Sequence, residues 1–395
     1  MNIIHQDALA AYQTKLLEYR RYLHAHPELS FQEVETQKYI IEHMSKLKHA
    51  EIIQPVGTSV LVKFVTGKVG PKIGLRADID ALPILEERHE LEFKSKHDGV
   101  MHACGHDIHT SMLMTACHYF DEHFDNLTGE VWAIFQHAEE LLPGGAQEMV
   151  ATGLFNDLDF IYGQHIWSNL PIGTIDVKDG PASSNTDAYI IKIQGKGGHA
   201  SQPENSIDPV IIGAMIVQKL QTIVSRMISP QEAGVISNTY FNSGRKEAIN
   251  VIPDVCYLGG SVRSSSEAMR HLFKDTITKM VNSTCEEYGA TCEIDYTLGY
   301  GVTYNNPEKT AFVRAIANEV EGATVIADKC MLGGEDFSAF ASIVPSTFVF
   351  VGGGNPKLDF DYPHHHPKFG IDEDGMMHGL QLLINVVEQY PSYFK

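Results

Sequence analysis

Residues 101–109 read MHACGHDIH, and Cys104, His106 and His109 lie within six positions of one another. These side chains are the donors that a zinc-type ion selects, because thiolate and imidazole are strong σ-donors for a borderline-soft cation. The alternative is a surface loop that happens to be rich in histidine. Further candidate ligands elsewhere in the chain favour the metal site.

Carboxylates and a histidine follow three expected strands. Asp78 and Asp80 come after the run GLRA, Glu139 and Glu140 after VWAIFQHA, and His165 closes DFIYGQH. Where a strand ends and the chain turns, adjacent carboxylates can enter one site, one as a ligand and one as a base. Each of these signals has an alternative explanation when it is taken singly. The aspartates could belong to a turn, the glutamates could be a solvated surface pair, and the histidine could be a residue of the core.

Three consecutive histidines stand near the end of the chain, in the stretch YPHHHP, before an expected helix. Such a tract can also bind stray metal, and the pattern leaves open which of His364, His365 and His366 is a ligand. The candidate donors are too many for one tetrahedral ion but suit two ions that share a bridging ligand and a water. They are Cys104, His106, Glu140, His165 and one of the three histidines.

The elements that must position these residues alternate between helix and strand in the first third of the chain. Apolar periodicity predicts helices over 6–24, 33–44 and 108–120. β-rich runs predict strands over 58–65, 72–75, 130–135 and 160–166. Short strands separated by helices indicate a largely parallel sheet covered on both faces, with ligands gathered at the carboxyl ends of its strands.

The pattern of helices and strands is interrupted at residues 180–184, GPASS, which are rich in residues that break regular structure and which we interpret as a linker. After it, strands over 188–194, 235–241, 255–262 and 290–296 alternate with helices over 209–225 and 267–287 in the βαββαβ order of a ferredoxin-like unit. A second linker near 299–307 leads back to helix and strand, ending in a helix over 376–387. We therefore predict a catalytic domain interrupted by a smaller inserted one, with boundaries 1–184, 185–297 and 298–395.

Bulk composition limits the functional classes. The chain has 395 residues, 43% of them hydrophobic, and a formal charge of −20, which repels phosphate backbones and argues against a nucleic-acid partner. Six cysteines without a CxxC pair fit a reducing cytoplasm. The N-terminus has no apolar signal region, and no stretch approaches a membrane span, so we expect neither export nor a membrane partner.

Several motifs, in order, resemble those of the N-acyl-amino-acid amidohydrolases, over essentially the whole chain. This group includes hippurate hydrolases, auxin-conjugate hydrolases and acetyl-diaminopimelate deacetylases, and it is related to acetylornithine deacetylase and carboxypeptidase G. The motifs are RRYLHAHPELSFQE, GLRADIDALP, MHACGHDIHTSML, HAEE with PGGA, GGHASQPENSIDP, INVIPD, GGEDFS and HHPKF.

The resemblance implies an α/β fold: a zinc-aminopeptidase-like α/β/α catalytic domain with an inserted ferredoxin-like α+β lid that often mediates dimerisation. It implies hydrolysis of the amide bond of an N-acyl amino acid by a homodimer or higher homo-oligomer with two divalent metal ions per subunit. Zinc suits thiolate and imidazole best, although manganese, nickel or cobalt would fit a bridged carboxylate site. The alternative function is a metallopeptidase that cleaves dipeptides or short peptides with the same two-metal site.

Carried over position by position, the family's ligands correspond to Cys104, His106, Glu140, His165 and His365. By the same resemblance Glu139 is the general base and His199 polarises the scissile carbonyl, often across the dimer. Side chains that would hold the substrate or support the site complete the set: Asn250 and Arg263 for the substrate, and Asp78 and Glu335 in support.

Two departures from the family pattern leave every donor in place: His137 stands where we expect proline, and Gly334 where serine is common. Di- and tripeptidase relatives carry a histidine two residues before the aspartate of this strand, whereas this chain has Arg76, and Cys104 takes the bridging role. Two other classes remain as alternatives. The glutamate pair disfavours a metal-binding protein without turnover, because a purely structural site needs no free base. A thiol hydrolase that uses Cys104 is disfavoured because the spacing shows no group that would orient its base.

Overall fold

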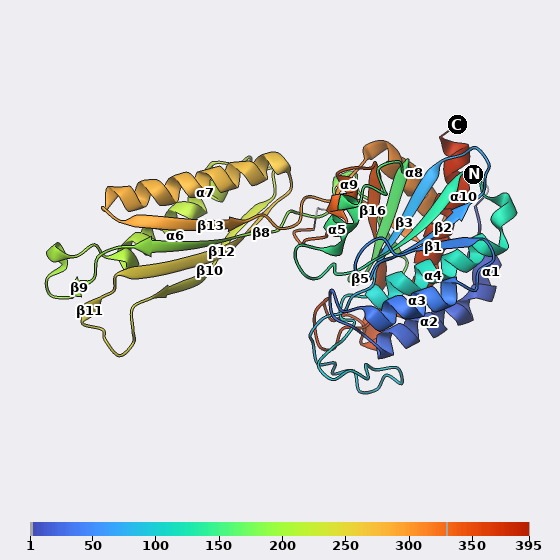
Figure 1. The fold of residues 1–395 in the computed structure, drawn as a ribbon, viewed down its shortest axis with the longest axis horizontal. Coiled ribbons are helices and arrows are strands. Elements are labelled where there is room, and N and C mark those ends of the chain that lie inside the picture. The colour runs from blue at the N-terminus through green and yellow to red at the C-terminus, as the bar shows by residue number, and fades with distance from the viewer. Residues whose placement is uncertain (1–2, 329–330, 395) are drawn as a thin grey trace. The chain divides into compact units, whose positions relative to one another are not determined.

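The computed structural model describes residues 3–328 and 331–394, and the chain divides into two compact units (Figure 1). Unit 1 comprises Met1–Ala182, Thr303–Lys329 and Asp336–Lys395, and unit 2 comprises Ser183–Val302 and Cys330–Glu335. An α/β unit interrupted by a smaller inserted one confirms the predicted fold class. The predicted boundaries 1–184, 185–297 and 298–395 stay a prediction; unit 2 also takes in residues 330–335.

Unit 1 contains an eight-stranded sheet in the order β1-β2-β4-β3-β5-β16-β6-β15. The four central strands, β4, β3, β5 and β16, run parallel, while β1, β2 and β6 pair antiparallel with their inner neighbours. The strands are β1 Ala50–Ile53, β2 Val60–Val65, β3 Lys72–Asp78, β4 Glu130–Gln136, β5 Phe160–Pro171, β6 Thr174–Asp176, β15 Thr324–Ile326 and β16 Ser346–Gly354. A separate short pair joins β7, Gly180–Pro181, to β14, Tyr304–Asn305.

The sheet is therefore mixed, because β15 also runs parallel to β6. The antiparallel pairs β1–β2, β2–β4 and β16–β6 are the difference from the largely parallel sheet that the sequence predicts. The connection from β1 to β2 spans residues 54–59, too few for the crossover that a parallel pair needs. Strand β5 also continues beyond the predicted end at residue 166, because β16 pairs with it as far as Pro171.

Helices α1, α2, α3, α4, α8 and α10 contribute to one large apolar core of unit 1 with the central strands. Helix α4 is buried along almost its whole length, and α10 packs against it. The shorter α5 and α9 contact each other next to β4 and β16. The helices are α1 Gln6–Leu9, α2 Gln13–Ala25, α3 Val34–Met44, α4 His106–Glu122, α5 Gly145–Ala151, α8 Pro307–Ala317, α9 Ser338–Ala341 and α10 Met376–Tyr393.

Unit 2 has the predicted βαββαβ order, with an antiparallel sheet arranged β10-β12-β8-β13. Side chains of β8 alternate between buried and more exposed, as expected when helices cover one face; α6 and α7 provide that cover and complete the apolar core (Figure 1). Its elements are β8 Asp187–Gln194, α6 Pro209–Arg226, β10 Gly234–Ser243, β12 Val255–Ser264, α7 Glu267–Glu287 and β13 Thr291–Thr297, with a small ribbon of β9 Gly198–His199 and β11 Val251–Ile252.

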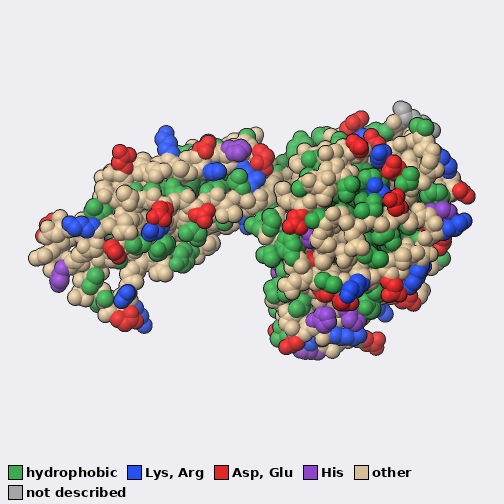
Figure 2. All heavy atoms as spheres, viewed as in Figure 1, with side chains coloured by type: hydrophobic (Ala, Val, Ile, Leu, Met, Phe, Trp, Pro, Cys, Tyr) green, Lys and Arg blue, Asp and Glu red, His purple; other side chains and the backbone are tan. Residues whose placement is uncertain are grey.

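The surface carries both signs of charge. On the face seen in Figure 2, acidic and basic side chains are interspersed on both units. Among the described residues, no helix combines the length and the apolar character that a membrane crossing requires.

Candidate metal centre

The carboxyl ends of the parallel strands in unit 1 meet the start of helix α4. Strand β3 ends at Asp78, and β4 ends three residues before Glu139. Gly105 joins Cys104 to α4 with φ +96°, and a Cβ there would stand 2.5 Å from Cγ2 of Ile166. Only glycine satisfies both conditions, so this tight turn is what presents the CGH residues to the strand ends.

One group of candidate ligands consists of Cys104, His106 and His165, all buried. Their ligand atoms lie within 4.8 Å of one another, and Cys104 Sγ is 3.4 Å from His165 Nε2. The other ring nitrogen of His165, Nδ1, is bound to the Ile166 carbonyl at 2.7 Å, so Nε2 is the unprotonated nitrogen that faces the thiol. This group has the donor set and tautomer that a zinc-type ion requires.

A second group contains Cys104 again, with Glu140 and His365, and its ligand atoms also lie within 4.8 Å. Nε2 of His365 is 3.2 Å from Oε1 of Glu140. His365 has φ +66°, a backbone conformation that few residues other than glycine adopt, and its amide donates to the Ala103 carbonyl at 2.8 Å. Strain of this kind gathers at functional sites. Cys104 is the donor that the two groups share.

The neighbouring histidines are engaged elsewhere. Nε2 of His364 accepts from the Ser168 amide at 3.2 Å, and its ring stacks on Trp167 with centroids 4.1 Å apart. Nδ1 of His366 accepts from the Lys368 amide at 3.0 Å. Of the three consecutive histidines, His365 is therefore the one whose ring meets Glu140.

His106 is held by Asp80 and turns its other nitrogen toward carboxylates. Its Nδ1 is 3.1 Å from Asp80 Oδ1, while Nε2 lies 3.6 Å from Asp78 Oδ2 and 4.0 Å from one oxygen each of Glu139 and Glu140. His106 Nε2 and Glu140 Oε1 are buried atoms without a hydrogen-bond partner. Unpartnered polar atoms that converge in this way fit a cation-binding site.

Glu139 follows a backbone turn that directs it toward the same place. Ala138 has φ +50°, and its amide donates to the buried Glu33 carboxylate at 2.8 Å. The amide of Glu140 donates to Asp80 at 3.0 Å. The turn therefore lets both adjacent carboxylates approach His106, as expected for the end of a strand.

The cluster carries an excess of negative charge from its buried carboxylates, and this charge shifts the pKa values of His106 and Cys104. Burial opposes a charge on His106, but Asp78, Asp80 and Glu140 raise its pKa to about 10. Burial and the carboxylates of Glu140 and Glu139 raise the pKa of the Cys104 thiol well above its usual range. A bound divalent cation would compensate this charge and favour the thiolate, so the residues present fit a metal centre.

His109 does not face the cluster as a ligand, although it belongs to the motif that first indicated one. Its Nδ1 binds Asp78 at 2.6 Å, and its Nε2 accepts from the Ile166 amide at 2.8 Å. Asp78 also accepts from Arg76, whose other arm pairs with the buried Asp336 at 2.8 Å. The ligand atoms of His109, Asp78 and His106 also lie within 4.8 Å of one another. Because both nitrogens of His109 already have partners, however, His109 and Asp78 hold the strand ends in place.

A second buried network, which the sequence interpretation missed, lies behind the CGH turn. Asp107 accepts from His24 at 2.8 Å and pairs with Arg20 at 3.2 Å, and His24 also binds Glu86 at 3.1 Å. Arg20 and His24 are four residues apart on α2, so they share one face of the helix. That spacing within RRYLHAH was the available signal.

The remaining predicted residues belong to unit 2. His199 is exposed in the β9/β11 ribbon, where Val251 pairs with it and the Asn250 carbonyl accepts from the Ala200 amide at 3.0 Å. The Ser201 amide donates to His199 Nδ1 at 3.2 Å, which leaves the ring proton on Nε2. His199 and Asn250 are thus brought together.

Arg263 and Glu335 are not part of that ribbon. Arg263 is at the other end of β12, eight residues beyond its first residue Val255, or roughly 25 Å along the strand. Glu335 is buried in the short segment 330–335. In the same segment a Cβ on Gly334 would stand 2.4 Å from Thr186, which explains why serine does not fit at this position.

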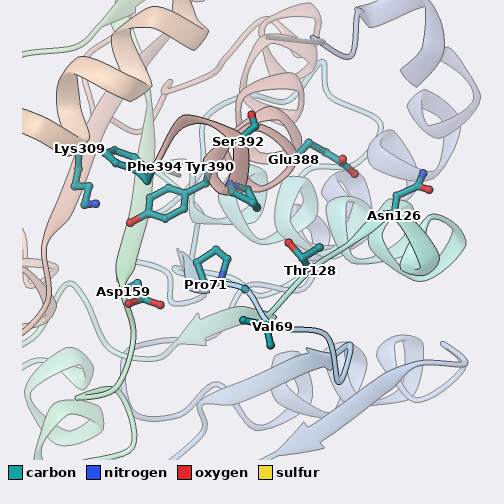
Figure 3. Close-up of a pocket in the computed structure, with 12 residues that line it drawn as sticks. Val69, Pro71, Asn126, Thr128, Asp159, Lys309, Glu388, Tyr390, Ser392 and Phe394 are labelled. Atoms are coloured by element: carbon teal, nitrogen blue, oxygen red, sulfur yellow. The ribbon is translucent and has the colours of Figure 1, made fainter.

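A hollow in unit 1 is a feature separate from the candidate metal centre (Figure 3). Its volume is about 760 Å³, and its lining includes Pro71, Thr128 and Asp159, which precede β3, β4 and β5. None of the described residues singled out above as a ligand, base or substrate contact lines it. Sheets of this kind bind ligands at the carboxyl ends of their strands, and the candidate metal centre, unlike this hollow, lies at those ends.

Known proteins resemble this chain along most of its length. The family model described as Peptidase family M20/M25/M40 matches residues 74–389. Thermostable carboxypeptidase 1 of Saccharolobus solfataricus is 41% identical over 91% of this chain and 91% of its own length. An N-acyl-L-amino acid amidohydrolase of Geobacillus stearothermophilus is 42% identical over 75% of this chain and 79% of its own. A solved Bacillus subtilis structure, described as a dinuclear metal binding peptidase from the M20 family, is 32% identical with a TM-score of 0.84, covering 97% of this chain and 99% of that one.

Proposed function

The chain belongs to peptidase family M20/M25/M40, and from this premise we propose that it hydrolyses the amide bond of N-acyl amino acids with two divalent metal ions. One observation carries the proposal: Cys104 belongs to two groups of three ligand atoms at the carboxyl edge of the sheet. The amidohydrolase of Geobacillus stearothermophilus supports the substrate class.

The two groups of ligands support one ion held by Cys104, His106 and His165, and a second held by Cys104, Glu140 and His365. Zinc is the metal we propose, because a shared thiolate with three imidazoles favours it. Manganese, nickel and cobalt are the alternatives. Elemental analysis of protein purified without added metal distinguishes them.

Bound ions would supply Lewis acidity, lowering the pKa of a water and polarising the scissile carbonyl. Glu139 takes the proton from that water, whose oxygen attacks the carbonyl carbon. When the carbon–nitrogen bond breaks, the protonated Glu139 delivers its proton to the leaving amine. The products are a carboxylic acid and an amino acid.

Unit 2 would complete the site. His199 carries its ring proton on Nε2 and donates it to the carbonyl oxygen, and Asn250 beside it holds the substrate. Arg263, at the far end of β12, would need to act in a different site from the His199 of its own chain. We propose that the protein is a cytoplasmic homodimer joined through unit 2, so that His199 serves the partner's metal centre.

Short-peptide hydrolysis is the second candidate function, favoured by the similarity to the Saccharolobus carboxypeptidase. The same ligands and base would cleave a peptide bond. A panel of N-acetyl and N-benzoyl amino acids against dipeptides separates the two. Higher kcat/KM for the dipeptides would overturn the amidohydrolase assignment.

The general base is tested by Glu139→Gln. Because glutamine cannot carry the proton, we expect turnover to fall by about 10²- to 10⁴-fold while metal content stays near that of the unchanged protein. Glu148→Gln is the matched control: Glu148 binds the His137 ring at 3.0 Å on helix α5 and takes no part in the ligand groups. Unchanged turnover in Glu139→Gln would remove Glu139 from the mechanism.

Metal removal distinguishes the metal mechanism from a thiol mechanism that uses Cys104 as the nucleophile. If the Cys104 thiol is a metal ligand, chelation should abolish activity and added zinc should restore it. Activity that survives complete removal of metal would support a nucleophilic Cys104 instead.

A further inference from the structure

Two cysteines of unit 2, outside the metal centre, approach each other where helix α7 ends and strand β13 begins. Cys285 is in the last turn of α7, and Cys292 is the second residue of β13. The intervening chain folds straight back: the Ala290 amide donates to the Cys285 carbonyl at 2.8 Å, and Gly289 has φ +71°. This tight return sets the start of β13 against the end of the helix.

The side chains meet across this turn. The Cys292 thiol donates to Asn282 Oδ1 at 3.3 Å, and Asn282 is three residues before Cys285, on the same face of α7. Cys292 also packs against the apolar core of unit 2, to which Cys285 belongs. Cys285 is buried in the apolar core of unit 2, whereas Cys292 is only partly buried at its margin.

We propose that Cys285 and Cys292 form a reversible thiol–disulfide site, with Cys292 as the entry point for a small disulfide such as oxidised glutathione. The Cys292 thiolate attacks one sulfur of that disulfide, breaks its S–S bond and releases one thiolate. The Cys285 thiolate then attacks Cys292 in the mixed disulfide and releases the second. Two cysteine thiols are oxidised, one small disulfide is reduced, and the two protons pass to the two released thiolates.

The direction of the exchange follows from exposure. Burial and the adjacent Cys292 raise the pKa of the Cys285 thiol to about 12, so Cys285 is the weaker first nucleophile but stands next to the sulfur it must attack second. The bond would tie the end of α7 to β13 inside the apolar core. Constraining the unfolded chain in this way stabilises unit 2.

The oxidation state of both cysteines can be measured on a single tryptic peptide. Trypsin releases residues 280–309 as a single fragment, since no lysine or arginine lies between Lys279 and Lys309, and it holds both cysteines and no other. The folded full-length protein is incubated with oxidised glutathione, quenched in acid, alkylated after unfolding and digested. We expect the fragment to lose two hydrogens, to carry no alkyl group, and to regain both thiols after dithiothreitol. The melting temperature should rise with oxidation by several degrees.

Two outcomes overturn the proposal: a fragment alkylated at both cysteines, or one that keeps glutathione on Cys292 with Cys285 alkylated. Cys292→Ser should abolish both the hydrogen loss and the rise in melting temperature. Cys256→Ser is the matched control, because Cys256 is buried in the same core on β12, and it should behave as the unchanged protein. The readout does not use hydrolysis, so its result is independent of the proposed function.

Discussion

Three adjacent histidines near the end of the chain have three different environments. The ring of His364 is stacked on Trp167, that of His366 accepts a backbone hydrogen bond, and that of His365 meets Glu140. The left-handed backbone of His365 separates its direction from those of its neighbours. Residue type alone cannot distinguish three such side chains, whereas backbone conformation does.

His365→Ala should therefore remove about one equivalent of metal and lower activity by at least about 10-fold, since a ligand of one ion is lost. His366→Ala should keep both the metal and the activity, because its ring binds only Lys368 and stacks on Tyr362. Metal content by mass spectrometry together with kcat/KM checks this. Loss of metal from His366→Ala but not from His365→Ala would reassign the ligand.

Gly105 is the residue on which the CGH turn depends. Gly105→Ala adds both the cost of φ +96° and a contact at 2.5 Å with Ile166. We expect it to lower the unfolding free energy by more than about 1–3 kcal/mol, the usual cost of such a backbone alone, and to weaken metal binding. Gly99→Ala is the matched control, with φ +76° and open space around the added Cβ. Equal losses of stability in the two variants would show that the contact with Ile166 is unimportant.

At the scale of elements, α4 serves two purposes. Its first residue, His106, belongs to the candidate metal centre, while His118 near its other end contacts α2. Nδ1 of His118 accepts from Lys15 at 3.1 Å, and Nε2 is 2.7 Å from the Tyr19 hydroxyl. Burial and the Lys15 ammonium lower the pKa of His118 to about 4. The packing of α2 on α4 therefore depends on a neutral ring.

This arrangement predicts a pH dependence of stability. The unfolded chain binds a proton at His118 near pH 6.5, and the folded protein only near pH 4. The unfolding free energy should consequently fall as the pH is lowered from about 6.5 to about 4. His118→Gln should show a shallower decline over this window, measured by denaturant unfolding of metal-free protein. Parallel curves for the two proteins would contradict the assignment.

At the level of the whole molecule, the proposed catalytic residues are divided between the two units. All five proposed ligands and the proposed base belong to unit 1, and His199 belongs to unit 2. On the proposed mechanism, turnover depends on both units, whereas metal binding depends on unit 1. Metal content and kcat should therefore respond separately to substitutions.

His199→Ala should lower kcat by about 10²- to 10³-fold, the usual effect of removing one donor to a developing oxyanion, with unchanged metal content. If His199 acts across a dimer, mixing His199→Ala with Glu139→Gln protein should restore part of the activity, because one intact site forms in each mixed dimer. Absence of rescue, with exchange of subunits verified, would place the action of His199 within one subunit.

The fold class, the inserted βαββαβ unit and the family could all be predicted from the sequence, because apolar periodicity and the order of several specific motifs are properties of the linear chain. The sequence also marked the strand-end carboxylates and the CGH residues as chemistry-bearing. Asp107, Asp336 and Arg76 were not assigned their roles, since their partners are up to 260 residues away in the chain.

Only the tertiary structure decided how the candidate donors divide. Within one motif, His106 has a ring nitrogen without a hydrogen-bond partner that faces the carboxylates of Glu139 and Glu140. Both ring nitrogens of His109, in contrast, are hydrogen-bonded, one to Asp78 and one to the Ile166 amide. The antiparallel pairing of β1, β2 and β6 with their inner neighbours, and the choice of His365 beside Glu140, were likewise decided in three dimensions. The physical reason is that a side chain's role depends on which atoms already have partners, and those partners come from segments that meet only when the chain folds.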